Sequence, residues 1–507
     1  MQKNSLPVRD ETHVVMFQPA AVKSPVTRTL RLSVFETGKS HHGESLLLFL
    51  TDPDPRHHIT RLNRSECITG SPLFLSTNGC GAMLRARVSW GMLDSRYDAL
   101  LAANLNPNFP EDRWIFLSRC RAWIVYQGYS QEICKNCLDA FSQDQSGWGI
   151  WRFHVPCGQG QHILLTIGMM MQPGENTVLM DFFRSPTDSL KSTLPDHQPV
   201  RLILRPDIED RSFHEVTKAY LGPEHGFPAC ISATDNGFRF SPASDRDLTV
   251  TLPDSEFFVA PEWQYMVYRS LEAERGLDPY SDLFSPGYFS VDITGSQSVR
   301  LIVAANADSQ KMQPSEKRFP SFIPESSILE QPSEAVWRVM KQSLMQFVVR
   351  RNDLMSVIAG FPWFLDWGRD SLIAVRGLIA AGELDVARSI ILQYARLEEN
   401  GTLPNMIQGK TPANRDTSDA PLWLFVAVSD LIQAEGSDSF LEADCGGRTV
   451  RDVLIAIGNA WCRGTPNGIH LDSSSGLIFS PPHFTWMDTN YPAGTPRQGY
   501  PVEIQAI

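Results

Sequence analysis

The sequence lacks the features that would place it in a membrane or outside the cell. No apolar run approaches the ~18 residues that a membrane-spanning helix needs. The first residues, MQKNSLPVRDETHVV, contain no apolar core of a signal peptide, so we expect none. The nine cysteines follow no spacing typical of a disulfide framework. Their scatter favours free thiols in a reducing, cytoplasmic compartment.

An excess of positive charge and the common cofactor motifs are also missing. The 45 Lys and Arg residues against 57 Asp and Glu give a formal net charge of -12. Such a chain repels phosphates, so we predict no nucleic acid and no membrane as partners and favour a neutral sugar polymer. No Rossmann or P-loop glycine fingerprint occurs. The CxxC of Cys134 and Cys137 has no second ligand pair for zinc. We therefore expect no cofactor and no metal, and the oligomeric state is not readable.

The first half of the chain has the pattern of a β-rich domain. With 507 residues, 42% of them hydrophobic, the chain is long enough for two or three domains with large cores. Residues 12–306 contain short apolar runs between Gly, Pro, Asn and Asp turns, without helical crossovers, which predicts an antiparallel β-sandwich. Examples are TRTLRLSVFET, SLLLFL, HILLTIGMMM, NTVLMDFF, PVRLILRP and SVRLIVAAN. The polar, Pro-containing residues 307–330 resemble a linker.

Residues 331–507 change to helical periodicity. Apolar residues recur at spacings of three and four, and the short loops favour about six paired, antiparallel helices. The segments are SEAVWRVMKQSLMQFVV, SLIAVRGLIAAG, ELDVARSIILQYARLEEN, APLWLFVAVSDLIQAEG, Thr449–Cys462 and the final YPVEIQAI. The segment GIHLDSSSGLIFS is predicted to form a small hairpin. The sequence thus predicts a β-domain followed by an all-helical domain.

Polar clusters precede two of these helices. The first, at 361–370, packs aromatic residues and a glycine against Arg369 and Asp370. Aromatic faces can stack on sugar rings, and carboxylates accept hydrogen bonds from sugar hydroxyls. The second, at 414–419, crowds polar side chains before APLW. In both cases the alternative is structural, since aspartates commonly cap helices and aromatics commonly fill cores.

A third cluster lies near the end of the chain. It consists of FTWMD at 484–488, TPR at 495–497 and PVE at 501–503. Asp488 follows Trp486 in an apolar setting, and burial raises a carboxyl pKa, which suits a general acid. The alternative is a loop aspartate paired with Arg497. Together the three clusters predict a polar pocket at one end of a helical barrel, and glycoside hydrolysis needs two carboxyl groups there.

The same motifs resemble a known family. FPWFLDWGRDSLIAVRGL, NRDTSDAPLWLFVAV and FTWMD with TPRQGYPVEIQAI are similar to the catalytic domain of bacterial-type glycogen-debranching enzymes. Leu75–Met83 and Asp94–Ala103 resemble the family's TNGLGG and RRYHGLL signatures, although Asp98 and Ala99 replace the His-Gly of the latter. Three further segments fit as well: Arg211–His214, Glu274–Asp278 and Phe284–Gly287.

The resemblance implies an N-terminal antiparallel β-supersandwich followed by an (α/α)6 barrel. It implies an amylo-α-1,6-glucosidase that hydrolyses α-1,6-linked glucose at glycogen branch points with inversion. Asp488 matches the general acid of the family. The implied substrate-binding residues are Trp367, Arg369 and Asp370 in the cleaved subsite, Arg415, Asp416 and Asp419 in the pocket wall, and Trp486, Arg497 and Glu503 around it. Glycogen or a branched α-glucan is the expected partner.

Against that family the barrel is partial, with about half of its helices recognisable. The family's general base is a glutamate expected beyond Ile507, so we predict little or no hydrolase activity for this polypeptide alone. No separate glucanotransferase domain is recognisable, so the expected substrates are stubs already trimmed by another enzyme. Two alternatives stay open: a non-catalytic carbohydrate-binding protein, and another barrel glucosidase of trehalase or glucoamylase type.

Overall fold

The computed structural model describes residues 6–9, 12–14, 26–36, 39–49, 58–144, 146–186, 192–306, 332–409, 411–488 and 498–507. The chain divides into two compact units. One comprises Met1–His57 with Phe322–Trp337, and the other comprises His58–Ser321 with Arg338–Ile507. The first unit contains two antiparallel hairpins, β1 (Leu6–Arg9) with β2 (Thr12–Val14) and β3 (Val26–Glu36) with β4 (Lys39–Phe49). The predicted linker 307–330 lies outside the described residues.

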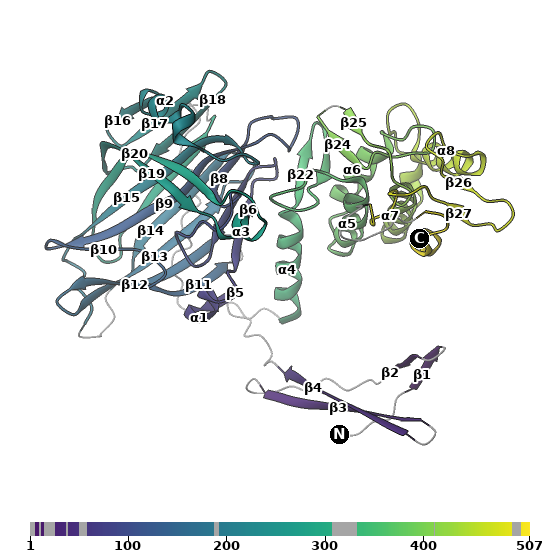
Figure 1. The fold of residues 1–507 in the computed structure, drawn as a ribbon, viewed down its shortest axis with the longest axis horizontal. Coiled ribbons are helices and arrows are strands. Elements are labelled where there is room, and N and C mark those ends of the chain that lie inside the picture. Colours follow the sequence, from purple (N-terminus) through teal and green to yellow (C-terminus); the bar gives the residue numbers. More distant parts are fainter. Residues whose placement is uncertain are drawn as a thin grey trace. The chain divides into compact units, whose positions relative to one another are not determined.

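Two large antiparallel sheets form the β-rich part of the second unit (Figure 1). The eight-stranded sheet has the order β19-β20-β15-β9-β8-β7-β6, with β10 paired to β9. Its strands are β6 (Leu73–Thr77), β7 (Met83–Arg87), β8 (Ala99–Asn104), β9 (Arg113–Tyr126), β10 (Tyr129–Glu132), β15 (Val200–Ser212), β19 (Glu256–Tyr268) and β20 (Tyr280–Ile293).

The nine-stranded sheet has the order β16-β17-β18-β21-β14-β13-β12-β11-β5. Its strands are β5 (His58–Asn63), β11 (Leu138–Asp144), β12 (Gly149–Gly158), β13 (Gln161–Met171), β14 (Thr177–Arg184), β16 (Ile231–Thr234), β17 (Gly237–Ala243), β18 (Arg246–Thr251) and β21 (Ser298–Ala305). Short helices connect some strands: α1 (Arg64–Ile68), the 3-10 helix η1 (Ala219–Leu221), α2 (Pro223–Ala229) and α3 (Ser270–Glu274).

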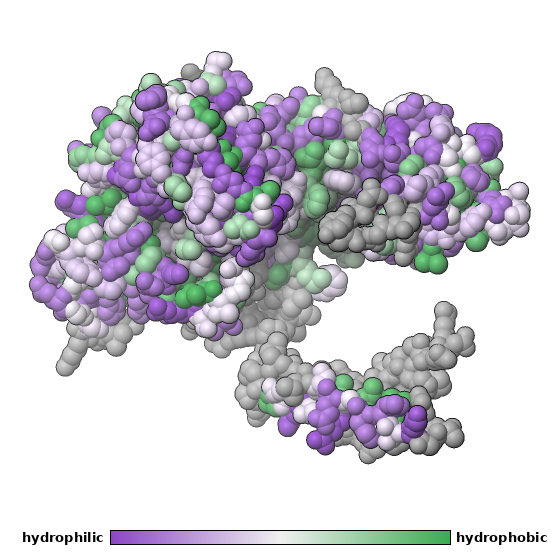
Figure 2. Space-filling view, viewed as in Figure 1, coloured by the Kyte–Doolittle hydropathy of each residue, from purple (hydrophilic) through white to green (hydrophobic). Residues whose placement is uncertain are grey.

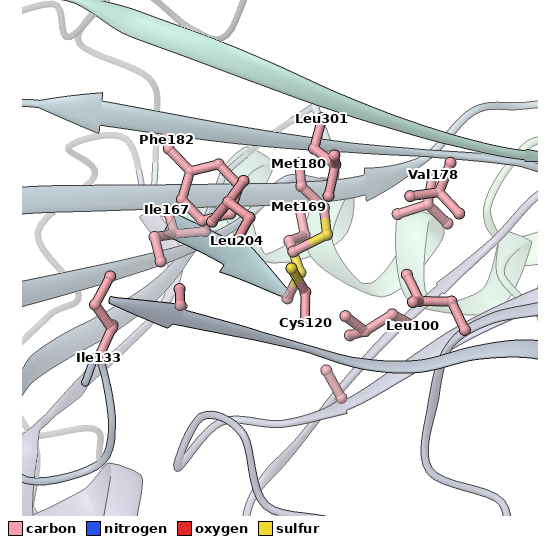
Figure 3. Close-up of a cluster of buried hydrophobic side chains, with 14 of the residues drawn as sticks. Leu100, Cys120, Ile133, Ile167, Met169, Val178, Met180, Phe182, Leu204 and Leu301 are labelled. Carbon is pink, nitrogen blue, oxygen red and sulfur yellow. The ribbon is translucent and has the colours of Figure 1, made fainter. Parts of the chain in front are cut away.

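The two sheets share one hydrophobic core. Figure 3 shows Leu100, Cys120 and Leu204 of the eight-stranded sheet together with Met169 and Phe182 of the nine-stranded sheet. All five side chains are buried. Because each strand places alternate residues on one face, the alternating runs read from the sequence supply these inward side chains. The antiparallel, β-rich character predicted for the first half of the chain is therefore confirmed.

The N-terminal boundary of the two large sheets differs from that of the predicted β-domain. The two large sheets begin with β5, whereas the predicted domain begins at residue 12. The hairpin strands β3 and β4 pair with each other, along their whole length. The bounds of the predicted domain stay a prediction.

The segment after residue 331 is mainly helical, as predicted, and the described part of it contains six α-helices. They are α4 (Pro332–Met345), α5 (Gly368–Ala380), α6 (Leu384–Ala395), α7 (Ala420–Glu435), α8 (Val450–Arg463) and α9 (Val502–Ala506), with a 3-10 helix η2 (Ser439–Glu442). Thr449 caps α8 through a capping box, and α7 ends at Gly436 in the left-handed conformation. None of these helices is long and apolar enough to cross a membrane, within the residues described.

Small hairpins interrupt the helices. Val348–Arg351 forms β22 and pairs with β23 (Leu354–Val357), where the sequence pattern predicts a continuation of the first helix. The β-branched Val348 and Val349 favour this extended conformation over a helix. A second hairpin joins β24 (Met406–Gln408) to β25 (Thr411–Ala413), and β26 (His470–Leu471) with β27 (Ile478–Phe479) is the hairpin that the sequence predicts.

Helices α5, α6 and α7 pack against one another (Figure 1). Their shared core includes Leu372, Ile390, Tyr394 and Leu424, each with no exposed surface. On the face shown in Figure 2, hydrophobic residues are scattered among hydrophilic ones over most of the second unit. The close packing of α5 and α7 is what brings their N-termini, and the polar clusters at those ends, into one neighbourhood.

Candidate active site

Three polar segments meet at the start of α5 and α7. The guanidinium Nη1 of Arg369 lies 3.2 Å from Oδ2 of Asp419, which joins the first segment to the second. The backbone N–H of Ser418 donates to the carbonyl of Phe484 at 2.6 Å, and its hydroxyl contacts that of Ser480 at 2.7 Å. These bonds join the second segment to the third. The structure therefore brings together the first two clusters and the FTWMD part of the third.

The carboxylates of the three segments interact electrostatically. Burial raises the pKa of the Asp370 carboxyl, and the Arg369 charge opposes this rise. The charges of Asp419 and Asp488 raise the pKa of Asp370 further. Like charges have this effect only when they lie close together. Asp370 and Asp419 therefore lie close to Arg369, and Asp488 lies near enough to Asp370 for its charge to act on that carboxyl group.

Neither Asp370 nor Asp419 caps its helix through a side-chain hydrogen bond, so the structure does not show the capping role that is their structural alternative. Asp370 is the third residue of α5, and the N-cap position is held by Trp367. Asp419 occupies the N-cap of α7 but its side chain makes no capping bond. Its carboxylate is 2% exposed and accepts hydrogen bonds from Arg369 and from the Thr417 hydroxyl at 2.7 Å. The Asp419 carboxylate is therefore buried and engaged by other side chains, whereas Asp370 is half-buried.

Asp488 is half-buried at the end of the third segment. Its backbone carbonyl contacts Nδ1 of His483 at 2.9 Å. Trp486 is 61% exposed, so its ring is not part of a buried core. Arg497, its alternative partner, lies outside the described residues.

The other predicted site residues have different surroundings. The guanidinium of Arg415 donates to the carbonyls of Thr402 at 3.1 Å and Leu397 at 3.0 Å. It therefore joins its loop to the segment that follows α6. Asp416 is exposed on that loop. Glu503 is half-buried in the first turn of α9. No contact recorded in the described part of the structure joins Arg415 or Asp416 to Asp370.

Sequence reasoning missed the residues that hold the first segment. Asp366 is fully buried directly before Trp367, and Nη2 of Arg351 donates to its Oδ1 at 2.7 Å. The same nitrogen lies 3.0 Å from Oε2 of Glu111, which precedes β9 of the sandwich. The signal in the sequence that could have indicated this cluster is Arg351, a charged residue just after the apolar run FVV. This buried ion cluster fixes the chain where it enters α5.

Two family models match successive parts of the chain. A model of the glycogen debranching enzyme N-terminal domain matches residues 74–300, and a model of the amylo-alpha-1,6-glucosidase domain matches residues 342–507. Together the two matches cover more than half of the chain, and they follow one another along the sequence. The chain belongs to the glycogen debranching enzyme family. The matched ranges fall on the two sheets and on the helical segment.

Two individual proteins are similar to the chain at a lower level. A glycogen debranching enzyme of Saccharomyces cerevisiae is 25% identical over 215 residues, which are 31% of this chain and 14% of the yeast protein. The chain therefore spans a small part of that relative's length. A crystal structure of bacterial glucoamylase complexed with acarbose covers 83% of this chain and 62% of its own, with 11% identity and a TM-score of 0.37. A TM-score of that size assigns no fold.

A glycine is required where α5, which carries the family's polar cluster, begins. A Cβ at Gly368 would lie 2.5 Å from the carbonyl oxygen of Pro404, so the backbone would have to move. We expect Gly368→Ala to lower the free energy of unfolding by about 1–3 kcal/mol, measured by urea denaturation. In the same helix, Gly377→Ala meets the Leu344 side chain at an ordinary 3.6 Å and should stabilise the protein by about 0.5–1 kcal/mol. Equal effects of the two changes would contradict the packing.

The shifted pKa of Asp370 predicts a pH-dependent gain in stability on substitution. Because the folded-state pKa is raised, the stability cost of ionising Asp370 is absent in acid and develops as pH rises through that pKa. Asp370→Asn removes this cost. We therefore expect the variant to melt at a higher temperature than the wild type at pH 7, with a gap that narrows as pH falls toward the unfolded carboxyl pKa of about 3.9. A gap that widens in acid would show that burial is not the cause.

Proposed function

We propose that the helical segment is part of an (α/α)6 barrel whose pocket hydrolyses α-1,6-linked glucose at the branch points of glycogen or a similar α-glucan. The observations that carry the proposal are the ion pair between Arg369 and Asp419, next to Asp370, and the bond from Ser418 N–H to the Phe484 carbonyl, which brings the segment of Asp488 to the same helix starts. Carboxylates and a guanidinium fixed in one place make strong, directional hydrogen bonds, which suit a ring of sugar hydroxyls. The match to the amylo-alpha-1,6-glucosidase domain model supports the choice of linkage.

In this proposal Asp488 is the general acid. It protonates the glycosidic oxygen as the bond to the glucose breaks, and the reaction inverts the anomeric centre. An inverting reaction also needs a second carboxylate, about 6.5–9.5 Å from the acid, to activate water. We assign only the acid role here. The chemistry consists of proton transfers among carboxylates, water and sugar, and the proposal includes no cofactor or metal.

The remaining residues are proposed to bind the sugar. Arg369 and Asp370 hold hydroxyls of the glucose that is released, beside the ring of Trp367. Asp419 positions Arg369 through the ion pair at 3.2 Å. We propose further contacts from Arg415, Asp416, Trp486, Arg497 and Glu503. A cytoplasmic location and an α-glucan partner belong to the same proposal.

The direct test is product analysis with the protein expressed from its complete gene. The substrates are a malto-oligosaccharide bearing one α-1,6-linked glucose, linear maltodextrin and trehalose. We expect free glucose from the branched oligosaccharide only. Glucose from trehalose or from linear maltodextrin would favour a trehalase-type or glucoamylase-type enzyme, and glycogen binding without any hydrolysis would favour a carbohydrate-binding protein.

A further inference from the structure

Two large aromatic side chains beside the proposed pocket have no role in it. Trp363 is 46% exposed and Phe364 is 48% exposed. Both lie in the loop that enters α5. The ring of Phe364 lies edge-on to that of Trp367, with centroids 6.2 Å apart. This loop leads directly into the turn that carries Arg369. A glucan chain attached to a glucose bound at Arg369 would therefore lie next to the loop.

A buried arginine of the sandwich holds the two aromatic residues in place. Arg113 of β9 is 1% exposed and donates to the carbonyls of Pro362 and Phe364, both at 2.8 Å. Its guanidinium also lies over the rings of Phe213, at 4.5 Å, and Phe361, at 5.1 Å. Burial lowers the pKa of Arg113 to about 10, so it stays charged at neutral pH. Aromatic surfaces that are fixed before binding lose little entropy when a ligand stacks on them.

The sandwich also places Tyr97 and His214 at the same loop. The Tyr97 ring lies edge-on to Trp363, with centroids 6.2 Å apart, and its hydroxyl contacts Nδ1 of His214 at 3.1 Å. His214 is exposed, and its carbonyl accepts a hydrogen bond from Arg96 at 3.0 Å. Partial desolvation of the ring and the charges of Arg113 and Arg96 lower the pKa of His214, which keeps the imidazole neutral at neutral pH. A neutral imidazole is suited to hydrogen bonding with a sugar hydroxyl.

The departure from the family's RRYHGLL signature supports the position of Tyr97. Asp98 is 1% exposed and accepts hydrogen bonds from the backbone N–H groups of Asp94, at 2.8 Å, and Ser95, at 2.9 Å. It also forms ion pairs with Arg85 and Arg87. The buried Asp98 carboxylate therefore stabilises the turn that contains Tyr97, which fixes the position of the Tyr97 ring.

We propose that Trp363, Phe364 and His214 form a sugar subsite for the α-1,4-linked glucan chain that carries the α-1,6-linked glucose. This inference rests on the proposed function, because it takes the bound glucose as the fixed end of the substrate. The sandwich thus contributes directly to substrate binding, through the segments Asp94–Ala103 and Arg211–His214 that have no role in the carboxylate pocket.

The experiment compares a long and a short substrate. Trp363→Ala and His214→Ala are made in the protein expressed from its complete gene. They are assayed on the branched malto-oligosaccharide and on α-glucosyl fluoride, which has no glucan chain. We expect the ratio of kcat/KM for the branched oligosaccharide to that for the fluoride to fall about tenfold in Trp363→Ala, with partial recovery in Trp363→Phe. A ratio equal to that of the wild type in both alanine variants would overturn the subsite and leave the proposed function intact.

Tyr129 supplies the matched control. It is 42% exposed and pairs with Tyr126 at the other end of β9. Thirteen residues along a strand place it ~40 Å from Arg113. Tyr129→Ala should leave the ratio unchanged. If the wild type hydrolyses neither substrate, the proposed function fails, and calorimetric titration with maltoheptaose decides the subsite alone. Affinity should fall about tenfold in Trp363→Ala and not in Tyr129→Ala, and equal affinities would overturn the proposal.

Discussion

Replacing Asp488 by asparagine is expected to lower kcat on the branched oligosaccharide by about 10²–10⁴-fold. The amide has nearly the same shape as the carboxyl group but cannot give a proton to the glycosidic oxygen. The leaving sugar would then depart as an unprotonated alkoxide. The measurement is the initial rate of glucose release, made with the protein expressed from its complete gene.

A second substrate separates proton donation from a general loss of structure. Fluoride leaves without protonation, so Asp488→Asn should keep a much larger share of its activity on α-glucosyl fluoride than on the branched oligosaccharide. Asp385→Asn makes the same chemical change at an exposed position in the first turn of α6 and should leave both rates near those of the wild type. Equal losses on the two substrates in Asp488→Asn would argue against its role as the acid.

Replacing Arg351 by methionine is expected to lower the free energy of unfolding by about 3–5 kcal/mol. The substitution leaves the carboxylate of Asp366, which is fully buried, without its guanidinium partner. It also removes the bond to the carbonyl of Gly409 at 2.8 Å and the ion pair with Glu111 at 3.0 Å. Equilibrium denaturation in urea, followed by tryptophan fluorescence, measures the loss.

A surface ion pair gives the control for this prediction. Arg396 pairs with Asp353 at 2.9 Å, but the two side chains are 34% and 70% exposed. Arg396→Met should therefore cost less than about 1 kcal/mol. The double variant Arg351→Met with Asp366→Asn should recover part of the loss, because the buried charge is gone. Similar losses for Arg351→Met and Arg396→Met would contradict the importance of the buried cluster.

The long, periodic elements of this fold could be predicted from the sequence, whereas some of the short ones could not. Helix α8 has a helical apolar pattern with a capping threonine, Thr449, at its start, and α7 has Pro421 near its start and Gly436 at its end. These are local signals. The hairpin β22–β23 has only four residues in each strand. Its position depends on contacts with distant residues, such as the bond from Arg350 N–H to the carbonyl of Gly79 at 2.8 Å.

The site shows the same limit. The sequence singled out Asp370, Asp419 and Asp488 because each stands in a polar, aromatic-rich cluster. It could not show that Arg369 bonds to Asp419, since that depends on the packing of α5 on α7. Nor could it identify Arg113 as a support of the aromatic loop, because Arg113 and Pro362 are 249 residues apart. Local composition indicates candidates for chemistry, whereas tertiary packing decides which of them meet.

The configuration of the first product tests the central claim most directly. Proton nuclear magnetic resonance can distinguish the two anomers of glucose in the first minutes after the protein is mixed with the branched oligosaccharide. An inverting α-1,6-glucosidase releases β-glucose first, and the α-anomer grows only as the sugar equilibrates in water. We predict that order. Initial release of α-glucose, or of an oligosaccharide in place of glucose, would contradict the proposed reaction.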